Sequence, residues 1–370
     1  MLGPRITLFD HALRLHRHDP DGVLPRDGKP YPDDALHRGR RPRSRDDART
    51  DGADVAAILD RHFAEADAAP GDLADAFHDV YVPIHRNEHI AAAAKRADRQ
   101  QVQRAGRWLV RHGTDQCAVT VGLALLATDW AEEDIPLIQT IGLLSSRFGP
   151  LAADALRRRH HGGTDALLWL AQRVAGWGRV YVVEELCRYG ASGAARRWLL
   201  QHACDGDFLN GYFAGRVATA AHLHEAIVGN DVDDDLVDHT GRLLKIMADC
   251  GGMGMTLEHY PPAPIVVAAH AAHLARQTPT PARYVTAAVI ADHLSDTAPH
   301  QSGCTTEQRD RIVQQYLAVL DRQDWCDMMR ADRDSDDPYG SGSGFYAWFA
   351  DTVAARLHLR SFSDPTDGDG

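Results

Sequence analysis

Apolar side chains recur every three or four residues from Ala53 to about Arg360, and this periodicity constrains the fold more than any other feature of the sequence. Residues at these spacings lie on one face of a helix and give it a stripe to bury. Glycine, proline and aspartate clusters separate the segments, among them Gly149-Pro150 and Gly162-Gly163, and no alternating run is bounded by hairpin turns. The sequence therefore predicts an all-α fold.

Two segments ninety residues apart end in the same way, because residues 107–113 read RWLVRHG and residues 197–203 read RWLLQHA. In each, we expect Trp and Leu on the buried side of a helix whose basic end complements the helix dipole. Gly113 permits a left-handed cap after the first copy. The spacing equals two units of about 45 residues, as in HEAT-type helix pairs. We expect an α-α superhelix of stacked helical hairpins, a HEAT-like solenoid; a single irregular bundle is the alternative.

Composition divides the chain into three regions. Residues 17–52 are rich in Pro, Gly, Asp and Arg and hold few large apolar side chains. We therefore expect residues 1–52 to form a largely disordered N-terminal arm, residues 53–360 a helical-repeat domain and residues 361–370 a disordered tail. The basic run Arg38–Arg45 is flanked by aspartates that balance its charge, so a solvated arm is favoured over a phosphate-binding one.

Charge and cysteine usage exclude several classes of protein. A net charge of −12 argues against general nucleic-acid binding. No apolar run approaches the roughly 20 residues of a membrane span, and the N-terminus lacks a signal-peptide pattern, so we expect a cytoplasmic protein. The six cysteines are widely spaced without a C-x-x-C pair, which argues against a disulfide framework or a zinc ribbon. Only three of the 40 basic residues are lysines, so single arginines carry less functional weight.

The acidic segment NDVDDDLVDHTG, residues 230–241, suggests two metal sites. As a calcium loop it fails, since Leu236 and Arg242 occupy the glycine and glutamate positions. A magnesium site on Asp234, Asp235 and Asp238 would need a second acidic motif on a facing helix. A helix N-terminus capped by Asn230 or Asp231 is the favoured interpretation.

His270 and His273 lie three residues apart on a predicted helix, and His259 and His293 are conceivable further ligands. A catalytic zinc ion needs three protein ligands, and nothing local selects a third. The glycines of CGGMGMT, residues 250–256, follow a helix rather than a strand, so an interhelical turn is favoured over a dinucleotide fingerprint. The sequence therefore predicts no metal site and no cofactor.

Residues 95–275 carry a resemblance to known proteins. GRWLVRHGTDQCAVTVGLALLA, EEDIPLIQTIGLLSSRFG and GWGRVYVVEELC resemble a family of bacterial, mainly actinobacterial, helical-repeat proteins. The segment Trp177–Leu186 is also similar to bacterial proteins named limonene hydroxylase, although Tyr181 stands where many of those proteins have His. The resemblance implies a helical repeat and transfers no catalytic residues.

Two predicted neighbouring hairpins supply the candidate binding site. In a solenoid, successive connections and inner helices line one surface, so polar and aromatic residues of adjacent hairpins share a groove. We expect Arg179 and Tyr212, if they are exposed, to serve binding rather than folding. For Trp177, the alternative is that the ring packs at the junction between two repeats. The predicted binding residues are Trp177, Arg179, Glu184, Asp205, Asp207, Asn210 and Tyr212.

These features favour a binding protein over an enzyme. We expect a cytoplasmic helical-repeat scaffold that binds a partner, in the first place a protein, through one face; a small-molecule ligand is also compatible. The enzymatic alternatives are monoterpene oxidation, implied by the limonene hydroxylase resemblance, and a HEAT-like DNA glycosylase. A glycosylase would need a basic concave face, and the acidic net charge argues against it.

Overall fold

The computed structural model describes residues 6–37, 51–65, 67–188, 193–297, 303–335 and 344–363. Within these ranges all regular structure is helical and no strand occurs, which confirms the predicted all-α class. The chain divides into two compact units, Met1–Arg188 (unit 1) and Tyr189–Gly370 (unit 2). The predicted domain 53–360 thus includes parts of both. None of the described helices is both long and apolar enough to cross a membrane.

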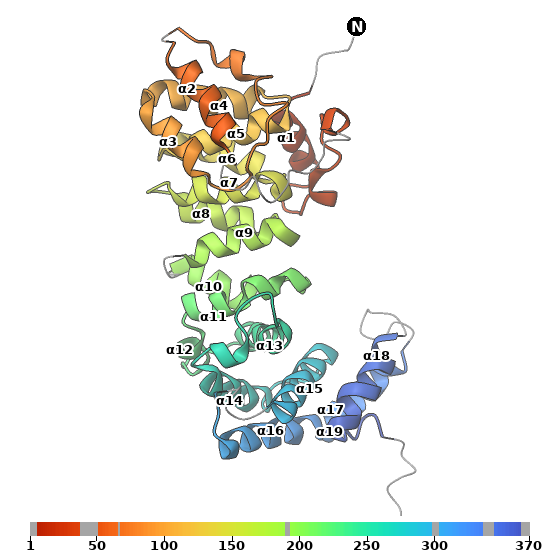
Figure 1. The fold of residues 1–370 in the computed structure, drawn as a ribbon. Helices are drawn as coiled ribbons and strands as arrows, with labels where there is room; N and C mark the ends of the chain where they lie inside the picture. The colour runs from red at the N-terminus through yellow and green to blue at the C-terminus, as the bar shows by residue number, and fades with distance from the viewer. Residues whose placement is uncertain are drawn as a thin grey trace, which may run out of the picture. The chain divides into compact units, whose positions relative to one another are not determined.

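Unit 1 consists of α-helices joined by short loops and 3₁₀ turns (Figure 1). Its α-helices are α1 (Leu8–His18), α2 (Ala53–Phe63), α3 (Glu88–Arg96), α4 (Arg99–His112), α5 (Gln116–Leu126), α6 (Ile135–Gly142), α7 (Ser145–Arg157), α8 (Gly163–Ala171) and α9 (Gly176–Cys187). The 3₁₀ turns are η1 (Pro25–Gly28), η2 (Asp34–His37), η4 (Pro70–Leu73) and η5 (Glu132–Asp134).

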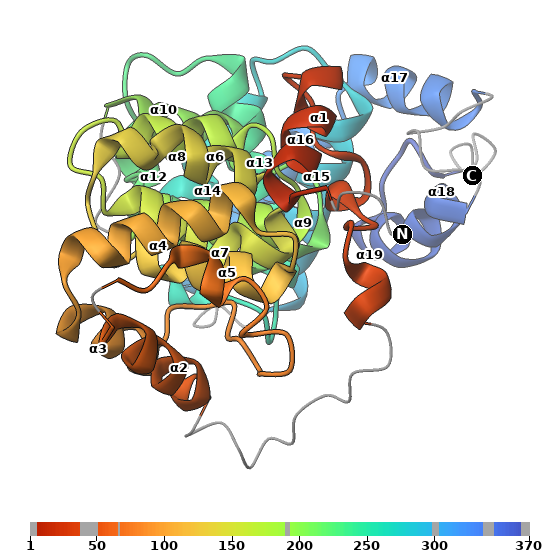
Figure 2. The same cartoon turned by 90° about the horizontal axis from the view of Figure 1, so that it is seen from above.

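The helices of unit 1 pack in two layers. Helices α5, α7 and α9 contact one another in succession, and α4, α6 and α8 do the same beside them. Helices α4 and α5 lie side by side in both views (Figures 1 and 2). Helix α5 is buried from Cys117 to Leu126, since its sequence is apolar on all sides and Asp115 caps its N-terminus. A helix buried all round forms the centre of this unit.

The two similar segments end α4 and α10 (Gly193–His202), each at a histidine as predicted. Leu109, Trp198 and Leu199 are buried, whereas Trp108 is only partly so. Between the copies the described chain holds three helix pairs, α4/α5, α6/α7 and α8/α9, where the spacing predicts two. The predicted number of units between the two copies was wrong, because the helices are shorter than those of a 45-residue unit.

Two predicted helix ends also differ. Gly113 is extended, with φ −64°, rather than left-handed. A Cβ there would lie 2.4 Å from the Leu109 carbonyl oxygen, so glycine is required for close approach. The predicted break at Gly149-Pro150 lies inside α7. Phe148 and Leu151 are buried on either side, so the apolar stripe continues through the proline.

The N-terminal segment is the largest departure from expectation. Residues 6–37, predicted as part of a disordered arm, contain α1, η1 and η2, and bury Leu8, Leu24 and Tyr31. The Asp27 carboxylate accepts hydrogen bonds from the backbone N–H groups of Ser145 and Ser146 at the start of α7 (2.8 and 2.7 Å). The segment is therefore held both by its buried apolar side chains and by its caps on a distant helix. The basic run Arg38–Arg45 lies outside the described residues.

Unit 2 repeats the two-layer packing. Helices α13, α15 and α17 contact one another in succession, as do α12, α14 and α16. Its α-helices are α10, α11 (Ala214–Ala220), α12 (Leu223–Ile227), α13 (Asp234–Asp249), α14 (Ala263–Leu274), α15 (Pro281–Asp296), α16 (Thr306–Leu320), α17 (Gln323–Arg333), α18 (Gly344–Phe349) and α19 (Ala355–Leu357). Between them lie η6 (Phe208–Tyr212), η7 (Leu257–His259) and a π-helical turn, Ala350–Ala354.

The predicted C-terminal tail begins as folded structure. Ser361 is buried and shares a 2.6 Å hydrogen bond with the Tyr284 hydroxyl, and the Phe362 ring packs against Phe349. These residues are ordered because Ser361 contacts a residue of α15 and Phe362 contacts a residue of α18. Residues 364–370 lie outside the described residues.

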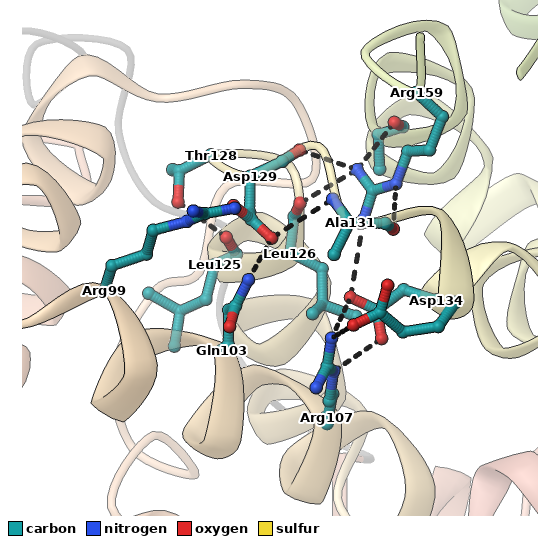
Figure 3. Close-up of polar contacts among 12 residues, drawn as sticks. Arg99, Gln103, Arg107, Leu125, Leu126, Thr128, Asp129, Ala131, Asp134 and Arg159 are labelled. Carbon is teal, nitrogen blue, oxygen red and sulfur yellow. Dashed lines mark hydrogen bonds and ion pairs between the residues drawn. The ribbon is translucent and has the colours of Figure 1, made fainter. Parts of the chain in front are cut away.

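A buried arginine fixes the end of α5 (Figure 3). The Arg159 guanidinium donates to the carbonyl oxygens of Leu126, Asp129 and Ala155 at 3.0, 2.9 and 2.8 Å, and to that of Ala131 at 3.2 Å. It also lies 3.8 Å from the Asp134 carboxylate, an ion pair too long for a hydrogen bond. Asp134 itself bonds Arg107, and Asp129 bonds Arg99 and Gln103. One side chain thus joins the last carbonyl of α5 to the loop that follows it and to α7.

We expect Arg159→Met to destabilise the protein by about 3–5 kcal/mol, because four carbonyl groups lose a charged donor and the buried Asp134 carboxylate loses a neighbouring positive charge. The neighbouring Arg158→Met is the matched control. Arg158 is 27% exposed and its partner Asp154 keeps a second arginine, Arg157, so its loss costs about 1 kcal/mol or less. Chemical denaturation of both variants measures the difference; equal losses would contradict the assignment.

Candidate functional site

The seven predicted binding residues divide between the two units. Unit 1 holds Trp177, Arg179 and Glu184 on α9, and unit 2 holds Asp205, Asp207, Asn210 and Tyr212 in and before η6.

On α9, the aromatic side chain is accessible. Trp177 is 42% exposed and stacks on Tyr181 with ring centroids 6.0 Å apart, so it does not fill a buried junction. The His85 ring meets Tyr181 edge-on at 5.5 Å, and burial lowers the pKa of His85 while the negative charge of Glu184 opposes this shift. The neighbouring Gly178 is buried, and a Cβ there would lie 1.9 Å from Ser145 Oγ, so the glycine of the W-G-R segment serves packing against α7.

Arg179 has a structural position. Its side chain is buried, and its guanidinium donates to the carbonyl oxygen of Ala171, the last residue of α8, at 3.3 Å. The condition of exposure that the sequence analysis set for a binding role of Arg179 is therefore not met in the structure. Arg179 binds at the C-terminus of α8 because the last carbonyl groups of a helix lack donors within the helix.

In unit 2, the predicted polar residues shape a loop. The Asn210 side-chain oxygen accepts from the Asp205 backbone N–H at 2.9 Å, and its amide donates to the Asp205 carboxylate at 3.0 Å. Asp207 caps η6 through the Leu209 N–H at 2.9 Å. Asn210 is buried, so it positions the loop, and Tyr212 is partly buried after it. Of these four residues, only Asp207 lines the cleft described next.

This loop forms one wall of a cleft of about 540 Å³ beside α13. The opposite wall comes from α13, the turn after it and the start of α15. Phe208, at the cleft edge, is 76% exposed, and Ile246 and Met253 add apolar surface. The charged lining residues are Asp207, Arg242, Lys245 and Asp249. Clefts of roughly 300–1,000 Å³ are typical of small-molecule sites.

The two cations of the cleft have no ion-pair partner. Arg242 and Lys245 lie three residues apart on α13, and neither makes a hydrogen bond or ion pair with a described residue. Burial lowers the pKa of Lys245, and the charge of Asp249 offsets part of this shift. Burial likewise raises the pKa of the Cys250 thiol in the same lining. The cleft therefore presents two cations that make no ion-pair contact with a described residue, beside two carboxylates of the same lining.

Two aspartates of the possible magnesium site, Asp234 and Asp238, are paired with an arginine of the protein. Arg283 bonds the Asp238 carboxylate at 2.7 and 3.0 Å and that of Asp234 at 3.0 Å. The N-cap of α13 is Asp233, a few residues after the predicted Asn230 or Asp231, because its carboxylate accepts from the Leu236 N–H. As predicted, residues 250–256 form a turn between helical segments.

The two histidines of α14 bind separate groups. His270 Nδ1 lies 2.7 Å from the Tyr316 hydroxyl, and complete burial lowers the pKa of His270 to about 3. His273 Nε2 lies 2.9 Å from the Ile227 carbonyl oxygen. The two imidazoles therefore serve the packing of α14 against different neighbours.

The chain matches no protein-family model, no curated protein and no solved structure. The function is therefore inferred from the geometry of the cleft and of the helix faces.

We expect Arg179→Ala to lower the free energy of unfolding by about 2–3 kcal/mol, because it removes a charged donor from a buried helix end. Trp177→Ala, two residues away, is the comparison, and its cost is smaller because the ring is already 42% exposed. Thermal and urea unfolding of the two variants measure this difference. A stable Arg179→Ala protein would restore Arg179 to the candidate binding residues.

Proposed function

We propose that the chain is a helical binding protein and that the cleft beside α13 binds a small organic anion with an apolar portion. The observation that carries this proposal is the pair Arg242 and Lys245, cations without an ion-pair partner among the described residues, in a cleft of about 540 Å³. A carboxylate or phosphate between them pairs with the exposed Arg242 and restores to the half-buried Lys245 the interactions that burial removes from a charge.

The apolar part of the ligand has a surface to contact. Phe208, Ile246 and Met253 line the cleft next to the cations, and the unbranched methionine side chain adapts to ligands of different shape. Binding sites commonly combine such apolar surface with few polar groups that orient the ligand. The carboxylates of Asp207 and Asp249 add negative charge to the lining, so they disfavour ligands with several anionic groups.

The same lining weighs against the enzymatic alternatives. A monoterpene, which has no charge, would leave four charged side chains without compensation on binding. DNA recognition by a glycosylase would need a predominantly basic surface, whereas this lining contains two acidic and two basic residues.

Binding of a protein partner is the second candidate. Its support is the exposed Trp177 ring stacked on Tyr181, since exposed aromatic residues often dominate protein interfaces. We also propose that the paired helices of each unit belong to a HEAT-like superhelix, as the successive contacts of α5, α7 and α9 support. Small-angle scattering tests this architecture, and a compact globular profile would reject it.

The anion proposal is tested with a thermal-shift panel of short-chain fatty acids and aryl phosphates, followed by calorimetric titration of the best binder. We expect Arg242→Gln to weaken binding about tenfold or more, because a charged hydrogen bond contributes about 1.5–3 kcal/mol. Arg311→Gln is the control, an exposed arginine of α16 away from the cleft lining. Equal affinity in both variants, or no binder in the panel, would refute the proposal.

Titration with pH separates Lys245 from Arg242. Because burial lowers the pKa of Lys245, its ammonium loses its proton below the pH at which an exposed lysine does. Anion affinity should therefore fall as pH rises through that lowered pKa. In Lys245→Arg, whose guanidinium stays charged, affinity should stay level over the same range. Identical pH profiles would show that Lys245 does not contact the anion.

A further inference from the structure

In unit 1, the N-terminal segment meets the start of α5 at a cluster of metal-ligating side chains. Asp33 and His37 come from the N-terminal segment, His78 from the loop after η4, and Asp115 and Cys117 from the start of α5. Apart from the nearby pairs Asp33/His37 and Asp115/Cys117, nothing in the sequence brings them together. The cluster is independent of the cleft in unit 2.

The ligand atoms of the cluster are close together. His37 Nε2 lies 3.1 Å from one oxygen of Asp33 and 3.2 Å from one of Asp115. The nitrogen, the Asp115 oxygen and Cys117 Sγ all lie within 4.8 Å of one another. A zinc ion holds such atoms at about 2.0–2.3 Å, so only a small inward movement closes the three around an ion.

The surrounding groups prepare this site for a cation. Asp33 and Asp115 are only 2% and 4% exposed, so two carboxylates are buried against one imidazole nitrogen. Asp115 also accepts from His78 and from the backbone N–H groups of α5, and Asp33 Oδ2 accepts from the Gln116 N–H. The other Asp33 oxygen, Oδ1, is buried and has no hydrogen-bond partner among the described residues. Buried charge of this kind calls for a counter-ion.

The remaining contacts fit zinc rather than a hard cation. The Arg147 guanidinium lies 3.7 Å from Cys117 Sγ, so the sulfur faces a polar neighbour and not an apolar core alone. His78 Nδ1 lies 2.7 Å from the same Asp115 oxygen, as expected of a residue that orients a ligand. A mixed sulfur, nitrogen and oxygen set is typical of zinc, whereas calcium and magnesium prefer oxygen alone.

We propose that His37, Asp115 and Cys117 bind a zinc ion, with Asp33 as the fourth ligand, and that the ion fastens the N-terminal segment to α5. His78 is a positioning residue that holds the Asp115 carboxylate. The site replaces the sequence-based prediction of no metal site.

The test uses the full-length protein, stripped with a chelator and titrated with zinc and then with cobalt. We expect one zinc ion per chain, a higher melting temperature with zinc, and a near-ultraviolet thiolate-to-cobalt absorption band that Cys117→Ser abolishes. No stoichiometric binding by the folded wild-type protein would overturn the proposal and leave the cluster as a hydrogen-bonded clasp.

Variants locate the site. His37→Ala should weaken zinc binding by more than His78→Ala, for which about 10–100-fold is expected of an orienting residue. His62→Ala and Cys304→Ser are the matched controls, an imidazole and a thiol outside the cluster. Circular dichroism checks that each variant folds. If a variant does not fold, the cobalt spectrum of the wild-type protein still tests whether a thiolate binds the metal. Unchanged affinity in His37→Ala and Cys117→Ser would place the zinc elsewhere and refute the assignment.

Discussion

An all-helical chain must find partners for the backbone groups at both ends of every helix, and here distant side chains meet much of this demand. Arginine is the main donor to helix C-termini. Arg159 binds carbonyls after α5, Arg179 the end of α8, Arg196 the carbonyl of Ala221 after α11, and Arg322 that of Ala275 after α14. Because its fork of N–H groups reaches several acceptors at once, one arginine joins neighbouring helices as well as capping one.

Aspartate does the same at helix N-termini. Asp115 caps α5 within its own sequence, whereas Asp27 caps α7 and Asp33 accepts from the Gln116 N–H of α5 from a distant segment. These long-range caps order residues 6–37 despite their low apolar content. At α5 they also gather enough carboxylate and imidazole groups for the proposed zinc site, so one constraint accounts for both the fold of the N-terminus and its chemistry.

Against this background, cations without protein partners stand out. Most buried or half-buried arginines of the chain have a carbonyl or carboxylate partner, and the abundance of arginine by itself says little about function. Arg242 is exposed and Lys245 is half-buried; both line a cleft, and neither has such a partner among the described residues. The proposed anion site therefore rests on the environment of these two residues, which distinguishes them from chemically identical ones elsewhere.

Periodicity in the sequence determined the helical class and most helix positions, because these depend on residues three or four apart. It also drew attention to Asp207 and to the loop it caps. Only the tertiary structure decided that Arg179 is buried, that Pro150 lies within α7, and that Asp33 and His37 meet Asp115 and Cys117. These outcomes depend on contacts between residues up to 84 positions apart in the chain. Local spacing contains no information about such contacts, because packing and the pairing of helix ends select them together.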